Sequence, residues 1–124
     1  MAQAAKPVIL VVEDEELLRI HAADLLDDQG FAVIEAGNAA AALKVLETRD
    51  DVRLLFTDVQ LPGAYDGLDL ARQVHERWPN ILLVITSGRA RPARAEIPDD
   101  GRFVPKPYRA DELICEVKDL MRKN

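Results

Sequence analysis

Five short apolar runs, separated by segments with helical spacing, restrict the fold of this chain most strongly. The run Val8–Val12 (VILVV) is continuously apolar, which is typical of a central strand buried on both faces. Similar runs occupy residues 31–36, 52–57 and 81–86, and a shorter one occupies residues 103–105. Strands that alternate with helices in this way predict an α/β protein built around a parallel sheet.

The helical segments have recognisable starts and stops. Apolar residues recur at helical spacing in residues 16–29, 39–49, 68–78 and 111–122. Gly30 is a typical helix stop after the first segment, and Asn38 is a candidate N-cap of the second. Trp78 precedes Pro79, and a residue before proline resists the helical conformation, so the third helix is expected to end there. Residues 89–101 are interrupted by prolines, so any helix there is expected to be short.

These elements predict a flavodoxin-like, doubly wound, five-stranded parallel sheet with helices on both faces. Right-handed crossovers leave few topologies, and a chain of this length suits the strand order 2-1-3-4-5. In that order the winding reverses between strands 1 and 3, and ligands bind beyond the carboxyl ends of those strands. Pro105 removes a backbone donor from the fifth run, so this strand is expected at an edge of the sheet.

Composition excludes several classes of protein. The chain has 124 residues, enough for one domain with one core, and its net charge of −6 argues against general nucleic-acid binding. Residues 1–7 carry one lysine and no apolar core, so we expect no signal peptide there, and no apolar run approaches the roughly 18–20 residues of a membrane span. The single cysteine, Cys115, cannot form an internal disulfide. We therefore expect a cytoplasmic protein without direct contact to nucleic acid or membrane.

Polar side chains stand at the ends of several strands. Glu13 and Asp14 follow the first run, Asp58 follows the third, Thr86 ends the fourth and Lys106 follows the fifth. Because the carboxyl ends of parallel strands meet at one edge of a sheet, we expect these side chains to lie close together. Taken singly, each has an ordinary structural explanation as a cap, a strand residue or a solvated charge. Their combination points to a site.

The three carboxylates predict a site for a hard cation. Carboxylates about 5 Å apart repel each other by roughly 3 kcal/mol per pair at an effective dielectric near 20. A bound cation or raised pKa values must offset this repulsion. All-oxygen ligands favour Mg²⁺, Mn²⁺ or Ca²⁺ over zinc, and a site with so few carboxylates suits Mg²⁺, which retains water ligands. Beside such a cation, Asp58 can attack phosphorus as a nucleophile, while Lys106 and Thr86 stabilise the phosphoryl oxygens.

The motifs around these residues resemble the receiver domain of bacterial two-component response regulators. The chain has V-V-E-D-E-E at the end of the first run, T-D-V-Q-L-P at the third, I-T-S-G at the fourth and F-V-P-K-P-Y at the fifth. Their order and spacing match the family over about residues 7–122. The resemblance implies that residues 1–124 form a single receiver domain without an output domain.

The resemblance also implies a role for each site residue. Glu13, Asp14 and Asp58 match the positions that hold Mg²⁺, together with the backbone carbonyl of Gln60, and no other cofactor is implied. Asp58 matches the phosphorylated aspartate. Thr86 matches the switch hydroxyl, and Lys106 matches the phosphate-binding lysine. Phe103 matches the aromatic residue that moves inward on activation. The Lys106-Pro107 bond matches a peptide bond that is usually cis in the family.

The function implied is a phosphorylation switch and not an enzyme with a separate substrate. The chain would accept a phosphoryl group from a sensor histidine kinase, a phosphotransfer protein or acetyl phosphate, and lose it by hydrolysis. It would then bind a protein target or relay the group to a histidine phosphotransfer protein. A nucleotide or flavin binder is disfavoured because acidic residues replace a glycine-rich phosphate loop after the first strand. A scaffold of the same fold that works without phosphorylation stays open.

Overall fold

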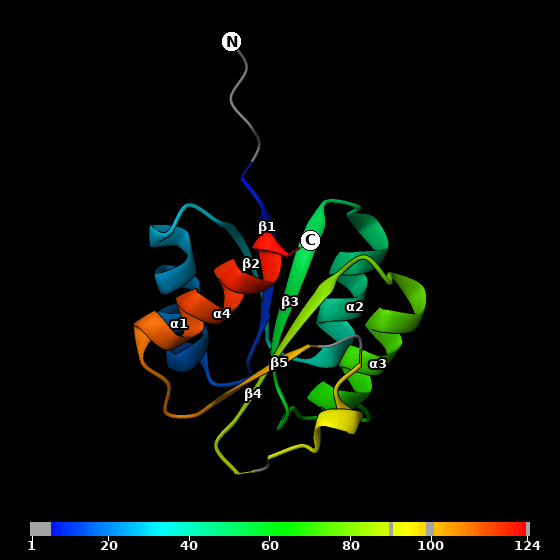
Figure 1. Cartoon of the computed structure of the whole chain (residues 1–124). Helices are drawn as coiled ribbons and strands as arrows, with labels where there is room; N and C mark the ends of the chain where they lie inside the picture. The colour runs from blue at the N-terminus through cyan, green and yellow to red at the C-terminus, as the bar shows by residue number, and fades with distance from the viewer. Residues whose placement is uncertain (1–5, 90, 99–100, 124) are drawn as a thin grey trace.

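A parallel sheet in the order β2-β1-β3-β4-β5 forms the centre of the molecule (Figure 1). The computed structural model describes residues 6–89, 91–98 and 101–123. Its strands are β1 (Val8–Val12), β2 (Ala32–Ala36), β3 (Val52–Asp58), β4 (Leu82–Ser87) and β5 (Arg102–Pro105). Every pairing between them is parallel. The predicted fold class and strand order are therefore confirmed, and β5 lies at an edge of the sheet as Pro105 indicated.

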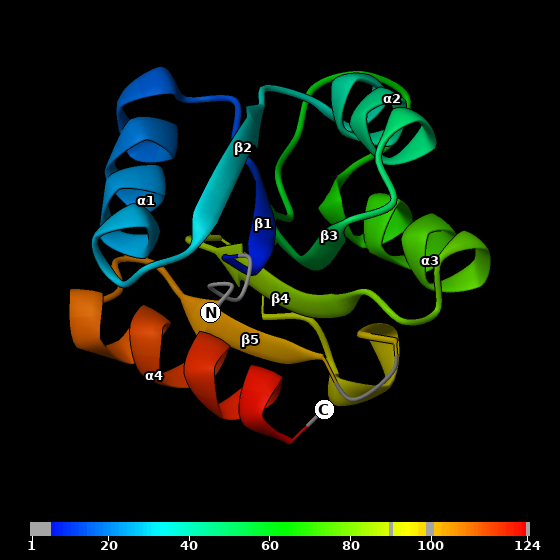
Figure 2. The ribbon, with the colours of Figure 1, turned by 90° about the horizontal axis from the view of Figure 1, so that it is seen from above.

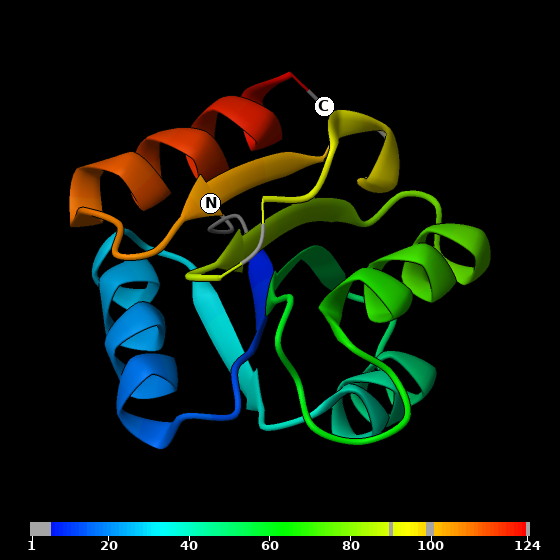
Figure 3. The same cartoon turned by 90° about the horizontal axis from the view of Figure 1, so that it is seen from below.

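Helices cover both faces of this sheet. The α-helices in the described residues are α1 (Glu16–Asp28), α2 (Ala39–Thr48), α3 (Gly67–Arg77) and α4 (Ala110–Arg122). Figures 2 and 3 show α1 and α4 on one face and α2 and α3 on the other. Ile9 and Val11 pack toward α1 and α4, whereas Leu10 and Val12 pack toward α2 and α3. The first strand is apolar throughout because both of its faces are buried.

Local signals in the sequence set the ends of these helices. Gly30, with φ of +91°, follows α1 in the left-handed conformation that glycine adopts without strain. The side chain of Asn38 accepts a hydrogen bond of 2.8 Å from the Ala41 amide and so caps α2. Helix α3 ends just before Trp78, as expected from Pro79. None of the helices in the described residues is long and apolar enough to cross a membrane.

The connection between β4 and β5 contains only a short 3₁₀ turn, η1 (Arg94–Glu96), in residues 91–98 that the structure describes. Ile97 follows this turn and is buried in the same core as Leu83. A Cβ on Gly101 would lie 2.7 Å from the Ile97 side chain, so the chain passes close to the sheet here. The prolines in this segment thus correspond to a tight turn that takes the place of a regular helix.

Gly67 brings the start of α3 against the end of β3. Its amide donates to the Val59 carbonyl at 2.8 Å, and Asp66 and Asp69 form a capping box at the start of α3. A Cβ on Gly67 would lie 1.8 Å from the carbonyl oxygen of Asp58. Only glycine allows this approach, which holds the loop after β3 next to the strand end.

We expect Gly67→Ala to lower the free energy of unfolding by about 2–3 kcal/mol, because the added methyl group forces the backbone at Asp58 apart. Gly37→Ala is the matched control: the nearest atom to its added Cβ is the end of the Arg19 side chain, at 3.6 Å. The control should change stability by about 0.5 kcal/mol or less. Urea unfolding measures both, and equal stabilities would contradict the proposed tight approach.

Candidate functional site

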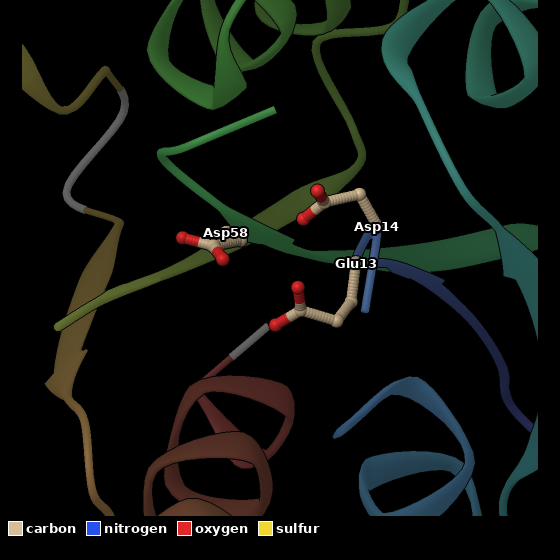
Figure 4. Close-up of side chains that lie close together, drawn as sticks. All are labelled: Glu13, Asp14 and Asp58. Carbon is tan, nitrogen blue, oxygen red and sulfur yellow. The ribbon is translucent and has the colours of Figure 1, made fainter. Parts of the chain in front are cut away.

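Three carboxylates meet where β1 and β3 end (Figure 4). Glu13 and Asp14 directly follow β1, and Asp58 is the last residue of β3. Each offers one oxygen, and these three oxygens lie within 4.8 Å of one another. Glu13 and Asp58 are both only 5% exposed, whereas Asp14 is open to solvent. The structure therefore brings together the acidic residues that the strand pattern placed at one edge.

The positive charge of Lys106 offsets the negative charge of two of these carboxylates. Its ammonium donates to Glu13 Oε1 at 2.5 Å and to Asp58 Oδ2 at 2.8 Å. The Lys106 amide donates to the Ser87 carbonyl at 3.0 Å, which joins the end of β5 to the end of β4. The Lys106-Pro107 peptide bond is cis, as the resemblance implied. A lysine from the edge strand thus reaches across to the ends of β1 and β3.

Burial and hydrogen bonding shift the pKa values of Glu13 and Lys106. Burial raises the pKa of the Glu13 carboxyl above its ordinary value, although the hydrogen bond from Lys106 acts in the opposite direction. Burial would lower the pKa of Lys106, but its hydrogen bonds to Asp58 and Glu13 raise that pKa overall. The lysine is therefore held in its charged form, while ionised Glu13 remains costly for the fold.

The second oxygen of Asp58 is held by the loop after β3. The Gln60 amide donates to Asp58 Oδ1 at 3.0 Å. The side-chain oxygen of Gln60 accepts a hydrogen bond of 2.8 Å from the Ser87 hydroxyl, and that hydroxyl accepts one of 3.1 Å from the Arg89 amide. These contacts connect the loop after β3 with the end of β4 at the rim of the site. Ser87 was not predicted as a site residue, although its place beside Thr86 at a strand end was a usable signal.

Thr86 lies beside Asp58 in the sheet, because the two residues are register partners of β3 and β4. Its buried hydroxyl donates to the Val104 carbonyl of β5 at 2.6 Å. Phe103, the preceding residue of β5, is half-buried against the core on the side of α2 and α3. The hydroxyl must leave Val104 before it can donate to a group on Asp58, so the switch roles of Thr86 and Phe103 stay predictions.

Two further residues support the site and were not identified from the sequence. Gly67 holds the loop after β3 against Asp58, as described above. Arg19 donates from its side chain to the main-chain carbonyl of Glu13 at 3.0 Å. Neither residue belongs to a strand end, so the rule that located the carboxylates could not find them.

The donor set is suited to a hard cation and a phosphoryl group. Carboxylate oxygens are the ligands that Mg²⁺ and Mn²⁺ prefer, and the described part of the chain places no cysteine or histidine in this cluster. Lys106 supplies a point charge for phosphoryl oxygens, and Thr86 supplies a hydroxyl. Asp58 and Glu13 both belong to the cluster and both accept from Lys106, and Asp58 is the one of the two that ends a strand.

Comparison with known proteins gives a consistent result. The family model for the response regulator receiver domain matches residues 9–118. The sensor kinase CckA of Brucella abortus is 33% identical over 119 residues, covering 93% of this chain and 12% of that protein. The transcriptional regulatory protein ResD of Bacillus subtilis is 31% identical over 126 residues, covering 99% of this chain and 51% of that protein. The chain therefore spans about half of the length of ResD and about an eighth of the length of CckA.

Solved structures agree with the sequence relatives. A response regulator receiver protein from Sinorhizobium medicae superposes with a TM-score of 0.86 at 29% identity, covering 94% of this chain and 95% of that one. The receiver domain of the hybrid histidine kinase CckA superposes with a TM-score of 0.79 at 31% identity, covering 92% and 98% of the two chains. With the acidic cluster at the ends of β1 and β3, these matches show that the chain belongs to the response regulator receiver domain family of two-component signalling.

Proposed function

We propose that the chain is a phosphorylation-dependent switch in which Asp58 accepts the phosphoryl group. One observation carries this proposal: the buried Asp58 carboxylate lies within reach of Glu13, Asp14 and the Lys106 ammonium at the end of β3. A carboxylate nucleophile needs such neighbours, since phosphoryl transfer depends mainly on positioning and charge neutralisation. The chain acts on its own aspartate, and any dephosphorylation is self-catalysed, so it is not an enzyme with a separate substrate.

The cation that fits this site is Mg²⁺, with Mn²⁺ as an alternative. Glu13, Asp14 and Asp58 would hold it together with the backbone carbonyl of Gln60. When bound, the cation neutralises charge on the carboxylates and on the phosphoryl oxygens. The exposed position of Asp14 beside two buried carboxylates supports this assignment, because Mg²⁺ usually retains several water ligands.

The side chains have complementary tasks in the transfer. An oxygen of Asp58 forms the new bond to phosphorus as the bond between phosphorus and the donor atom breaks, and the donor leaves with that electron pair. Lys106 stays protonated and pairs with the transferred group. The Thr86 hydroxyl exchanges the Val104 carbonyl for a phosphoryl oxygen, which frees an acceptor on β5. Phosphorylation of Asp58 on β3 would thereby change a hydrogen bond of the edge strand β5.

The phosphodonor that we propose is a histidine kinase or a histidine phosphotransfer protein. Helix α1 begins beside the acidic cluster and exposes Leu17, Leu18 and Ile20, whose exposed fractions are 81%, 39% and 40%. An apolar patch at the rim of the site fits a helical protein that delivers its phosphoryl group to Asp58. Small donors such as acetyl phosphate do not need this surface.

The acceptor is tested first with acetyl phosphate and Mg²⁺, followed by intact mass. We expect one phosphoryl adduct on the wild type and on Asp24→Asn, which changes an exposed aspartate of α1. Asp58→Asn should carry none, because an amide is not a nucleophile toward phosphorus. An adduct on Asp58→Asn would place the acceptor elsewhere. A wild type that stays unmodified and does not bind beryllofluoride would support a scaffold that works without phosphorylation.

The donor surface is tested with Leu17→Glu. The added charge in the apolar patch should slow phosphotransfer from a purified histidine kinase about tenfold, because it disrupts the centre of the contact. The rate with acetyl phosphate should stay the same. Thr48→Glu adds the same charge to an exposed residue of α2 and should alter neither rate. If Leu17→Glu slows both reactions equally, the effect lies in the site and not in docking.

The cost of ionised Glu13 predicts how metal-free stability depends on pH. Burial raises the folded-state pKa of the Glu13 carboxyl above its ordinary value, so stability falls as the pH rises from the unfolded-state pKa through the folded-state pKa. Glu13→Gln removes this loss. Without metal, we expect the variant to melt about 2–4 °C above the wild type at pH 7, and the difference to vanish near pH 4. A less stable variant at pH 7 would mean that the pair with Lys106 outweighs burial.

A further inference from the structure

Arg19 connects three segments beside the acidic cluster. It lies in the first turns of α1, and its Nε donates to Glu35 Oε1 of β2 at 3.1 Å. Its Nη1 donates to the main-chain oxygen of Glu13 at 3.0 Å and lies close to Gly37. The side chain is only 21% exposed, so the guanidinium is mostly covered by these neighbours. Arg19 therefore has a defined orientation and contacts the backbone of a site residue.

The turn between β1 and α1 is held mainly at Glu13, whose carboxylate accepts from the Glu15 amide at 3.2 Å and from Lys106. The Glu13 amide donates to the Ala36 carbonyl of β2 at 3.1 Å, and its own carbonyl accepts from Arg19. Glu15, the N-cap residue of α1, makes no side-chain capping bond in the described residues. Ala36 of β2 and Arg19 thus hold the main chain of Glu13 at its amide and at its carbonyl, on the two sides of its Cα. This turn carries two of the three carboxylates of the cluster.

We propose that Arg19 is a positioning residue of the cation site, which keeps the turn at Glu13 and Asp14 in the orientation that brings their carboxylates to Asp58. The inference rests on the proposed Mg²⁺ site. Groups that orient metal ligands without touching the metal typically affect metal affinity about 10- to 100-fold. Arg19 acts on the backbone of a ligand and not on its carboxylate, so we expect a loss near the lower end of this range.

Charge repulsion alone predicts the opposite change in Mg²⁺ affinity when Arg19 is removed. A guanidinium next to a cation site repels the cation, so removing its charge should strengthen Mg²⁺ binding if charge alone matters. If Arg19 positions the turn, its removal should weaken binding, because the carboxylates then lose part of their preorganisation. The direction of the change in affinity therefore distinguishes a positioning role from a merely electrostatic one.

The test is isothermal titration of Mg²⁺ into the wild type, Arg19→Met and the matched control Arg77→Met. Arg77 pairs with Glu47 at 2.9 Å between α3 and α2, so its removal also deletes one ion pair between two elements and one positive charge. We expect a dissociation constant about tenfold higher for Arg19→Met and within about twofold of the wild type for Arg77→Met. Asp14→Asn serves as the reference for loss of a carboxylate.

A second pair of variants separates positioning from a loss of stability. Arg19→Lys keeps the charge and can still donate to the Glu13 carbonyl, so it should recover part of the affinity. Glu35→Gln leaves the bond between Arg19 and Glu13 in place and should have a smaller effect than Arg19→Met. Metal-free melting temperatures of the two methionine variants should fall by similar amounts, so that stability alone does not explain the difference in binding.

The outcomes are distinct. Unchanged or tighter Mg²⁺ binding by Arg19→Met would overturn the positioning role while leaving the proposed cation site intact. A wild type that does not bind Mg²⁺ would overturn the proposed site itself. If Arg19→Met does not fold, Arg19→Gln takes its place, because it also removes the charge and the contact with the Glu13 carbonyl: weaker Mg²⁺ binding with intact melting would support the inference, and unchanged or tighter binding would overturn it.

Discussion

Compensation of buried negative charge is the constraint on which the site depends. Glu13 and Asp58 are almost fully buried, and the oxygens of the cluster lie within 4.8 Å of one another. Carboxylates at about 5 Å repel each other by roughly 3 kcal/mol at an effective dielectric near 20. The ammonium of Lys106 contacts both buried carboxylates and offsets part of this repulsion. Burial still raises the pKa of Glu13, so its ionised form remains costly, and a bound cation would offset this cost.

The sheet connects the charged site at Asp58 to the edge strand β5. The strand order places β3 between β1 and β4, so Asp58 has the acidic turn on one side and Thr86 on the other. The Thr86 hydroxyl is bonded to Val104 of the edge strand β5, which also leads to Lys106. Under the proposed function, a phosphoryl group on Asp58 would compete with the Val104 carbonyl for the Thr86 hydroxyl, a contact that ties β4 to β5. The short turn η1 leaves this side of the molecule without a regular helix in residues 91–98.

Much of the fold could be predicted because its signals are local. The apolar runs, the cap at Asn38 and the stop at Gly30 each depend on a few neighbouring residues. The strand ends then located the carboxylates and the lysine, since parallel strands share one edge. The contacts of Arg19 with Glu13 and of Ser87 with Gln60 could not be predicted in this way. They depend on how side chains from separate elements are directed in the folded molecule.

Periodicity, proline and glycine act over short distances, so the amino-acid pattern was enough to predict the strands, the helices and the residue types at the carboxyl edge of the sheet. The strand order followed from the handedness of the crossovers and the chain length. Which atoms pair at that edge depends on how distant segments pack in the folded molecule. Lys106 bridges Glu13 and Asp58, the Thr86 hydroxyl is directed to Val104, and Gly67 lies against the Asp58 carbonyl. These contacts form because packing brings distant segments to within a few ångströms of one another. Burial then sets the energetic cost of each unpaired charge.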